Sequence, residues 1–124
     1  MKKLIGWVLL PLSILCSDAF ALTLNTGPVA TATTEGINRV IWCVAENLTT
    51  KPQEVVAELL NGKGEVSYKN AKTLEPGVTD WIAGWNVSSG GGLTHCRFAL
   101  KTNKVRAYLQ VQENYVTTVT QEAR

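Results

Sequence analysis

Apolar residues recur at every second position in several segments of this 124-residue chain, which narrows the folds that it can adopt. Between positions 103 and 112, Val105, Ala107, Leu109 and Val111 alternate with polar or amphipathic residues. A period of two places one face of an extended strand in a core and the other in solvent. We therefore expect strands rather than helices. The other segments in which we expect strands are 38–46, 54–60, 65–69, 78–87, 94–101 and 115–119.

Three details of the pattern indicate how these strands are arranged. The segment 38–46 is apolar on both faces, which is typical of a central strand or of one whose outer face is covered. The segment 54–60 would also suit a short helix, but its length and the Asn-Gly-Lys-Gly turn that follows favour a strand. Only the polar residues 101–104 separate 94–100 from 105–112, so we expect these two strands to form an antiparallel hairpin.

Two segments carry further expectations. Residues 22–34 are rich in Thr and contain Pro28, which confines them to an edge strand or a broken one. In 78–87, Trp81, Ala83, Trp85 and Val87 fall on one face of a regular strand. We expect this face to belong mainly to the core; the alternative is that its two Trp rings form a platform for sugars. With about seven or eight short strands and frequent turn signals, the sequence predicts an all-β chain folded as a single antiparallel β-sandwich.

The first 21 residues predict export. Met1-Lys2-Lys3 is a short cationic start, residues 4–15 are mostly apolar, and Ala19-Phe20-Ala21 places small residues where a signal peptidase reads them. We expect a signal peptide at 1–21, a domain at 22–124, and a periplasmic or secreted product. The alternatives are an uncleaved anchor, for which the apolar stretch is short, and a lipoprotein acylated at Cys16, although Leu15 is not the small residue normally found before such a cysteine.

The charge of the mature chain excludes one class of partner. Of twelve basic residues Lys2 and Lys3 leave with the signal, and of ten acidic residues Asp18 does, so the expected net charge is +1. A chain that functions by binding nucleic acid usually has a strongly basic patch. Because the expected charge is close to zero, we do not expect nucleic acid as a partner. The mature chain has no second long apolar run, so we expect no membrane span after cleavage.

The two cysteines that remain after cleavage are Cys43 and Cys96. In an oxidising compartment such a pair is expected to form a disulfide. The bond would close a loop of about 54 residues, which corresponds to roughly 4 kcal/mol in the chain-entropy model. A redox role would favour a C-x-x-C spacing, so we expect a structural cystine.

The position of this pair, early and late in a series of strands, resembles the inter-sheet disulfide of immunoglobulin-like sandwiches. The resemblance covers roughly residues 38–112. A true immunoglobulin domain has a Trp on the strand after the first Cys and a Tyr two residues before the second, whereas 54–60 lacks Trp and the second position is Thr94. The resemblance thus implies an exported bacterial sandwich nearer the fibronectin type III style. It leaves open whether the two cysteine strands lie in opposite sheets or side by side.

The sequence contains no recognisable catalytic or cofactor motif. Ser88 or Ser89 with His95 and Asp80 would supply the residue types of a hydrolase triad, but the serines precede Gly90-Gly91-Gly92 rather than occupying a G-x-S-x-G elbow. His95 has no second His or free Cys at metal-ligand spacing. We therefore expect no enzyme activity, no catalytic residues, no cofactor and no metal.

A binding surface is the remaining hypothesis. On the expected hairpin, Arg97, Arg106 and Tyr108 would project from one outer face with His95 close by, a combination that suits an acidic protein surface or an anionic sugar. The alternative, which single exposed aromatics favour, is a solvated sheet face on which cross-strand side chains cover one another. Trp42, opposite the inward-facing Cys43, would be an exposed anchor if no loop covers it.

From these features we expect an exported, non-catalytic binding module that docks another envelope or extracellular protein, with polysaccharide as the second choice. The first alternative is a structural subunit whose Thr-rich terminal segments pair with the open sheet edge of a neighbour. The second is an uncharacterised hydrolase.

Overall fold

The computed structural model describes residues 20–31, 36–87 and 92–124, and every regular element in these ranges is a strand. The prediction of an all-β chain is confirmed. The region around Pro28 breaks the first strand in two, as the sequence indicated. The strands are β1 (Leu22–Asn25), β2 (Val29–Ala30), β3 (Arg39–Asn47), β4 (Gln53–Asn61), β5 (Val66–Leu74), β6 (Thr79–Val87), β7 (Leu93–Leu100), β8 (Val105–Glu113) and β9 (Val116–Glu122).

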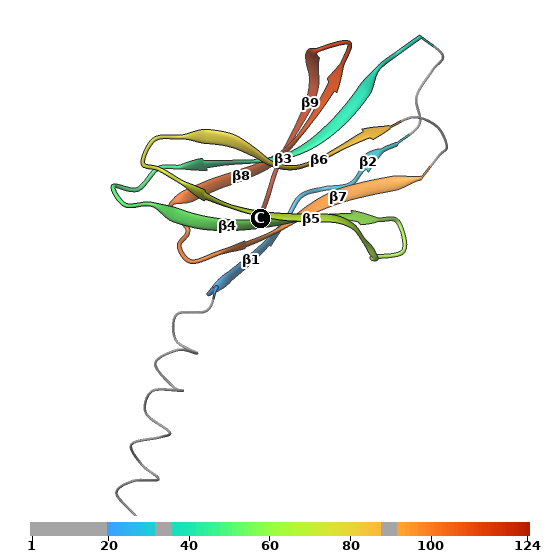
Figure 1. Ribbon diagram of the computed structural model, residues 1–124. Coiled ribbons are helices and arrows are strands. Elements are labelled where there is room, and N and C mark those ends of the chain that lie inside the picture. Colours follow the sequence, from blue (N-terminus) through green and yellow to red (C-terminus); the bar gives the residue numbers. More distant parts are fainter. Residues whose placement is uncertain (1–19, 32–35, 88–91) are drawn as a thin grey trace, which may run out of the picture.

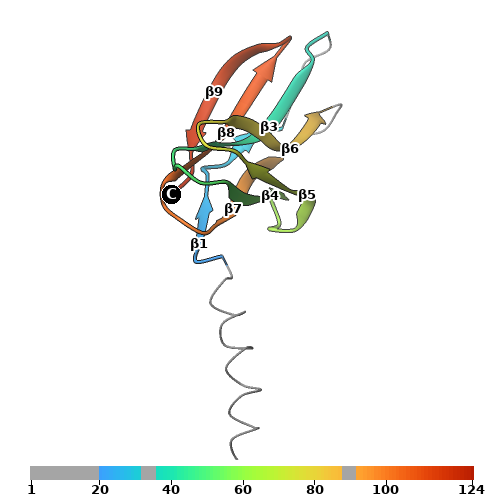
Figure 2. The same cartoon turned by 60° about the vertical axis from the view of Figure 1, so that its left-hand side comes forward.

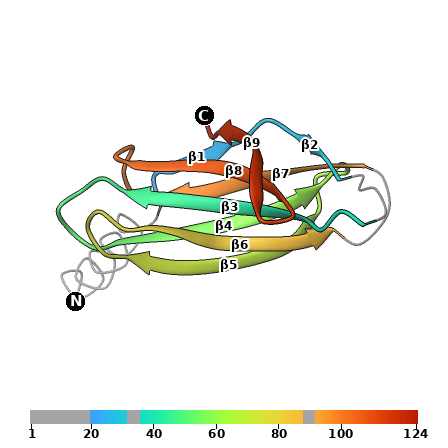
Figure 3. The ribbon, with the colours of Figure 1, turned by 90° about the horizontal axis from the view of Figure 1, so that it is seen from above.

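The strands form two antiparallel sheets that pack face to face (Figure 1). The first, which we call the five-stranded sheet, has the order β1-β7-β4-β5, and β2 also pairs with β7. The second, the four-stranded sheet, has the order β6-β3-β8-β9. Seen from above, the long strands of the two layers run in similar directions (Figure 3), as in aligned β-sandwiches.

The core consists of the residues that alternate inward from both sheets. On β8 the buried side chains are the four that the period of two selects, and on β7 every second residue from Thr94 to Leu100 is buried. Burial of these apolar side chains is the main favourable contribution to folding. The fully buried apolar residues of the core are Ile41, Cys43, Ala45, Val55, Ala57, Leu59, Cys96, Phe98, Leu100, Leu109 and Val111.

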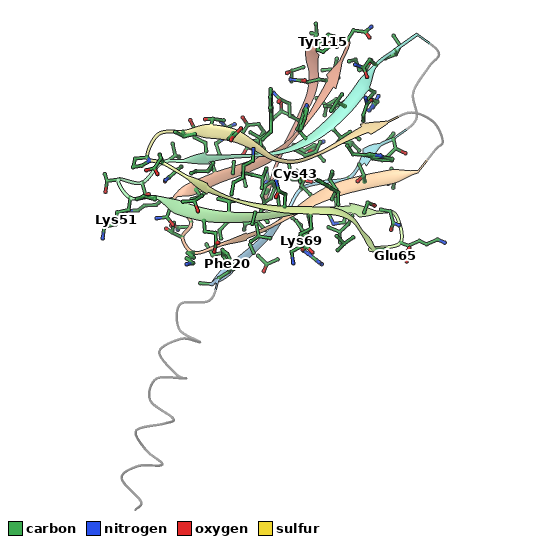
Figure 4. The ribbon with its side chains drawn as sticks, in the orientation of Figure 1. Phe20, Cys43, Lys51, Glu65, Lys69 and Tyr115 are labelled. Atoms are coloured by element: carbon green, nitrogen blue, oxygen red, sulfur yellow. A yellow bond between two sulfur atoms is a disulfide. The ribbon has the colours of Figure 1, made fainter. Side chains whose placement is uncertain are left out.

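A disulfide between Cys43 and Cys96 joins the two sheets at their centre. Cys43 lies on β3 and Cys96 on β7, both side chains are fully buried, and their Cα atoms are 5.7 Å apart. Figure 4 shows Cys43 between the two layers. The predicted bond is therefore confirmed, and the two cysteine strands lie in opposite sheets.

The predicted hairpin of 94–100 with 105–112 is wrong. Residues 101–104 carry the chain from one sheet to the other, so β7 pairs with β1, β2 and β4, whereas β8 pairs with β3 and β9. A short polar connection and alternating strands suit a crossover between sheets as well as a hairpin. β1 pairs with an edge of β7 and β3 pairs with an edge of β8, so two strands that are distant in sequence take the place of the β7–β8 pairing.

The prediction of a strand at 54–60 is confirmed. This segment is part of β4, which lies between β7 and β5. The side chain of Asn61 closes the following turn by accepting hydrogen bonds from the backbone N–H groups of Lys63 and Glu65 at 2.9 and 3.0 Å. Gly64 in this turn has a φ of 80°, which a residue without a Cβ adopts at little cost.

Hydrogen bonds and an ion pair connect the two sheets along both sides of the sandwich. On one side, the backbone N–H and C=O of Asn25 in β1 pair with those of Arg124 at 3.1 and 2.9 Å. On the other side, the Asn70 side chain of β5 donates to the carbonyl of Ile82 in β6, and Lys72 Nζ lies 3.2 Å from Asp80 Oδ2. The edges β1 and β5 are thus linked to the opposite layer.

One buried polar side chain organises the end of the molecule where β3 finishes. Asn47 is fully buried, and its Nδ2 donates to the carbonyls of Lys51 and Leu74 at 2.8 and 2.9 Å. Its Oδ1 accepts from the backbone N–H and the hydroxyl of Thr49. Asn47 therefore holds the β3–β4 turn against the end of β5, and every hydrogen-bonding group of its amide is satisfied.

Replacing both cysteines with Ala should destabilise the fold by about 4 kcal/mol, because the unfolded chain regains the freedom of a loop of 53 residues. Urea unfolding of the oxidised protein and of the double variant measures the difference. Reduction of the wild type with dithiothreitol is the matched control and should move its midpoint to that of the variant. Equal stability of all three samples would contradict this prediction.

The substitution Asn47→Ala should lower the free energy of unfolding by roughly 2–4 kcal/mol, because it leaves buried backbone groups without partners. Asn103→Ala is the control, since Asn103 is exposed and should change stability by less than about 0.5 kcal/mol. Thermal and urea unfolding report both values. A loss at position 47 no greater than that at 103 would show that the amide network contributes little.

Candidate functional site

The residues predicted to form one basic and aromatic surface lie on opposite sides of the molecule. Arg97 and His95 are on β7 and belong to the outer face of the five-stranded sheet. Arg106 and Tyr108 are on β8 and belong to the outer face of the four-stranded sheet. The idea of a single shared face is therefore wrong, and the reason is the crossover at 101–104.

Arg97 makes an ion pair within its own sheet. Its Nε donates to Glu58 Oε1 at 2.9 Å, and the two residues are directly opposite each other on β7 and β4. Half-buried His95 lies on the same face and pairs in register with Leu60. Arg97 thus connects two neighbouring strands, and its charge is balanced by a carboxylate.

Arg106 is also balanced by carboxylates. Its guanidinium binds the Glu122 carboxylate through Nε and one terminal nitrogen, and the other terminal nitrogen lies 4.0 Å from Glu46 Oε1. The guanidinium also lies over the Tyr108 ring, 4.8 Å from its centroid. The hydrogen bond that Arg106 donates to Glu122, followed by the charge of that carboxylate, raises the pKa of Arg106 above its ordinary value. An anionic ligand would have to compete with two acidic side chains for this cation.

Trp42 projects from the outer face of the four-stranded sheet, as predicted, but it is covered by another aromatic ring. Its ring stacks against that of Trp81 with centroids 4.9 Å apart and planes inclined by 19°. Its other contacts are with Gly84, where an added Cβ would lie 2.2 Å from ring atoms, and with Gln112, whose Oε1 accepts from Nε1 at 3.3 Å. Trp42 is therefore a half-buried support rather than an exposed anchor.

Trp81 is the exposed ring of this pair, although regular alternation along the strand predicts that it faces the core. The register between β3 and β6 shifts between Cys43 and Val44, so that Ile82 and Ala83 are both buried and Trp81 turns outward with 47% of its surface exposed. Trp85 remains opposite Ile41 on the inner side. A β-bulge reverses the alternation on one side of it, and the run Trp81-Ile82-Ala83, apolar at three successive positions, was the only signal of it in the sequence.

Three side chains form a row across the middle of the four-stranded sheet. Val44 on β3 is directly opposite Trp81 on β6 and Tyr108 on β8. Only 2% of Val44 is exposed although it faces outward, because its aromatic neighbours flank it. The row borders a hollow of about 350 Å³ that we call the aromatic hollow. It is lined by Val44, Thr79, Asp80, Trp81, Tyr108, Gln110 and Gln112.

The two glutamines of the aromatic hollow each have one half of the amide engaged. Gln110 Nε2 donates to the Thr117 hydroxyl at 3.0 Å, and Gln112 Oε1 accepts from Trp42 Nε1. Among residues 20–31, 36–87 and 92–124, no side-chain hydrogen bond engages Gln110 Oε1 or Gln112 Nε2. The hollow therefore offers one acceptor and one donor whose orientation is fixed by their partners.

The residues considered for catalysis are not assembled. Asp80 on β6 is held by Lys72 and by the backbone N–H of Trp81, whereas His95 lies on β7 of the other sheet. Ser88 and Ser89 lie outside the described residues. Within the described ranges, no three His, Cys, Asp or Glu side chains are grouped as metal ligands would be. Nor does that part of the chain contain a helix of the length and hydropathy needed to cross a membrane.

Comparison of the chain with protein-family models, with curated proteins and with solved structures gave no match.

The substitution Gly84→Ala should separate the stacked rings of Trp42 and Trp81, because the added methyl group would occupy space that the Trp42 ring fills. Near-ultraviolet circular dichroism and tryptophan fluorescence measure the change in the stack. Gly62→Ala is the matched control, since its Cβ would lie no closer than 3.8 Å to any neighbour. Identical spectra for Gly84→Ala and the wild type would contradict this packing.

Proposed function

We propose that the mature chain, residues 22–124, is an exported binding domain without catalytic activity. The buried disulfide supports export, because such bonds persist in oxidising compartments. The signal-like segment 1–21 gives independent support from the sequence. On this proposal the protein acts in the periplasm or in the extracellular medium, and its rigid core serves to present a surface.

We also infer that the fold is a variant of the immunoglobulin-like sandwich. In favour of this, β3 pairs with β6, β4 pairs with β7, and the disulfide connects β3 with β7 across the sheets, as the corresponding strands do in immunoglobulin domains. The variation lies in β8, which joins β3 in the four-stranded sheet, while β1 takes the place beside β7 where the last immunoglobulin strand would lie.

The observation that carries the binding proposal is the row of exposed Trp81, buried Val44 and half-buried Tyr108 beside the aromatic hollow. Accessible Trp and Tyr rings beside an apolar floor are enriched in binding sites, since they bury a large area and lose little conformational freedom. The partner is an envelope or extracellular macromolecule that docks on this face. This proposed surface differs from the predicted one: it includes Tyr108 but neither Arg97 nor Arg106.

A specific observation also favours the alternative of a structural subunit. The edge strand β9 carries no charged residue between Val116 and Gln121, and Tyr115 at its start is 86% exposed. Figures 2 and 4 show β9 beside β8 and Tyr115 at the tip of this hairpin. An uncharged exposed edge is a template for pairing with another strand. The segment 22–30, in contrast, already pairs with β7 of its own chain.

Site-directed photo-cross-linking tests which surface meets the partner. A benzophenone amino acid replaces Trp81, Lys69 or Val116 in turn, and the protein is exported and irradiated in the cells that make it. We expect adducts, detected by mass spectrometry, from position 81 and none from position 69 on the outer face of the five-stranded sheet. Adducts only from position 116, joining two copies of the chain, would favour the structural alternative. No adduct from position 81 would remove the proposed face.

A further inference from the structure

We propose that the aromatic hollow binds a segment of an uncharged polysaccharide, an inference that rests on the proposed binding function of this face. The ligand class follows from the rings of the hollow, its unengaged amide groups and its charge balance.

The rings provide the apolar part of the site. A sugar ring presents C–H groups on its faces and hydroxyls around its rim, so it stacks on an aromatic ring and hydrogen-bonds at its edges. Trp81 and Tyr108 stand on either side of Val44, which gives two aromatic walls and an apolar floor. Small-molecule sites typically combine such walls with a few fixed polar groups, at volumes from about 300 Å³ upward.

The unengaged amide groups suit hydroxyls in particular. A hydroxyl both donates and accepts, and the hollow offers Gln110 Oε1 as acceptor and Gln112 Nε2 as donor. A carboxylate or sulfate would use only the donor, and an ammonium only the acceptor. The hydroxyl of Thr79, also in the lining, adds a group that can do either.

The charged side chains around the hollow already have partners, and together they leave one excess negative charge. Asp80 is paired with Lys72 on one side, and Arg106 is paired with Glu122 and Glu46 on the other. An anionic ligand would have to displace a carboxylate from Arg106 or from Lys72 and would meet the excess negative charge, whereas a neutral ligand leaves these pairs in place. These charges favour an uncharged polysaccharide over the anionic sugar that the Arg residues suggested in the sequence.

The site is also held in shape before any ligand arrives. Trp81 rests on Trp42, and Trp42 is fixed by Gly84 beneath it and by Gln112 at its indole nitrogen. Gln110 is fixed by Thr117. Because these side chains are already ordered, binding loses less conformational entropy at the hollow than it would at a mobile surface.

The test uses the purified mature protein on an array of neutral and anionic glycans, followed by titration calorimetry with the best neutral ligand. We expect binding to neutral glycans, with an affinity that changes little between low and high salt because no net charge is neutralised. Trp81→Ala should weaken this affinity at least about tenfold. Gln112→Glu, which keeps an acceptor for Trp42 but removes the free donor, should weaken it by a similar factor.

Two control variants separate the site from general damage. Trp85→Ala removes a ring of comparable exposure, 39%, from the same strand but outside the hollow, and Lys69→Ala alters the other sheet. Both should bind as the wild type does, and thermal unfolding shows whether each variant is folded.

The remaining outcomes would overturn the inference. Binding only to anionic glycans, or neutral binding unaffected by Trp81→Ala, would do so directly. If no glycan binds while position 81 cross-links to a protein, the polysaccharide inference fails and the binding function stands. If no glycan binds and position 81 gives no adduct, both proposals fail together.

Discussion

The contact on which the structure depends is the covalent bond between the two central strands of opposite sheets. β3 has β6 and β8 as neighbours, and β7 pairs with β1 and β2 on one side and with β4 on the other, so the Cys43–Cys96 bond connects two strands that are each paired on both sides. Both cysteines belong to a buried core that side chains from both layers build. The disulfide fixes how the two sheets lie relative to each other. It thereby also fixes the position of the outer face that carries the aromatic hollow.

Much of the fold could be predicted because it depends on patterns among residues that are close in sequence. The period of two in 105–112 gives the buried face of β8 directly, and the apolar outer face of 38–46 predicted that side chains would cover it, as the Trp42 and Trp81 rings do. Predicting the disulfide required only the signal-like composition of residues 1–21 and a count of the cysteines that follow them. These features depend on residues close in sequence or on chemistry that does not need the topology.

The errors arose where the answer depends on residues far apart in the chain. Residues 101–104 would suit either a hairpin or a crossover, and the choice is made by β1 and β3, which compete for the edges of β7 and β8. The outward turn of Trp81 depends on a register shift against β3, and alternation within β6 alone could not show it. The candidate site in the structure differs from the predicted one for both reasons. Arg97 and Arg106 were separated by the crossover, and Trp81 joined Tyr108 through the bulge.

The burial of Asn47 has a consequence for producing the protein. Asn47-Leu48-Thr49 fits the acceptor pattern for N-linked glycosylation, yet the folded chain surrounds this amide completely. In a eukaryotic secretory pathway the sugar is added while the chain is still emerging, before the amide can be enclosed. A chain modified there could not form the bonds to Lys51 and Leu74, so the oligosaccharide transferase of such a host would compete with folding. Bacterial export avoids that competition.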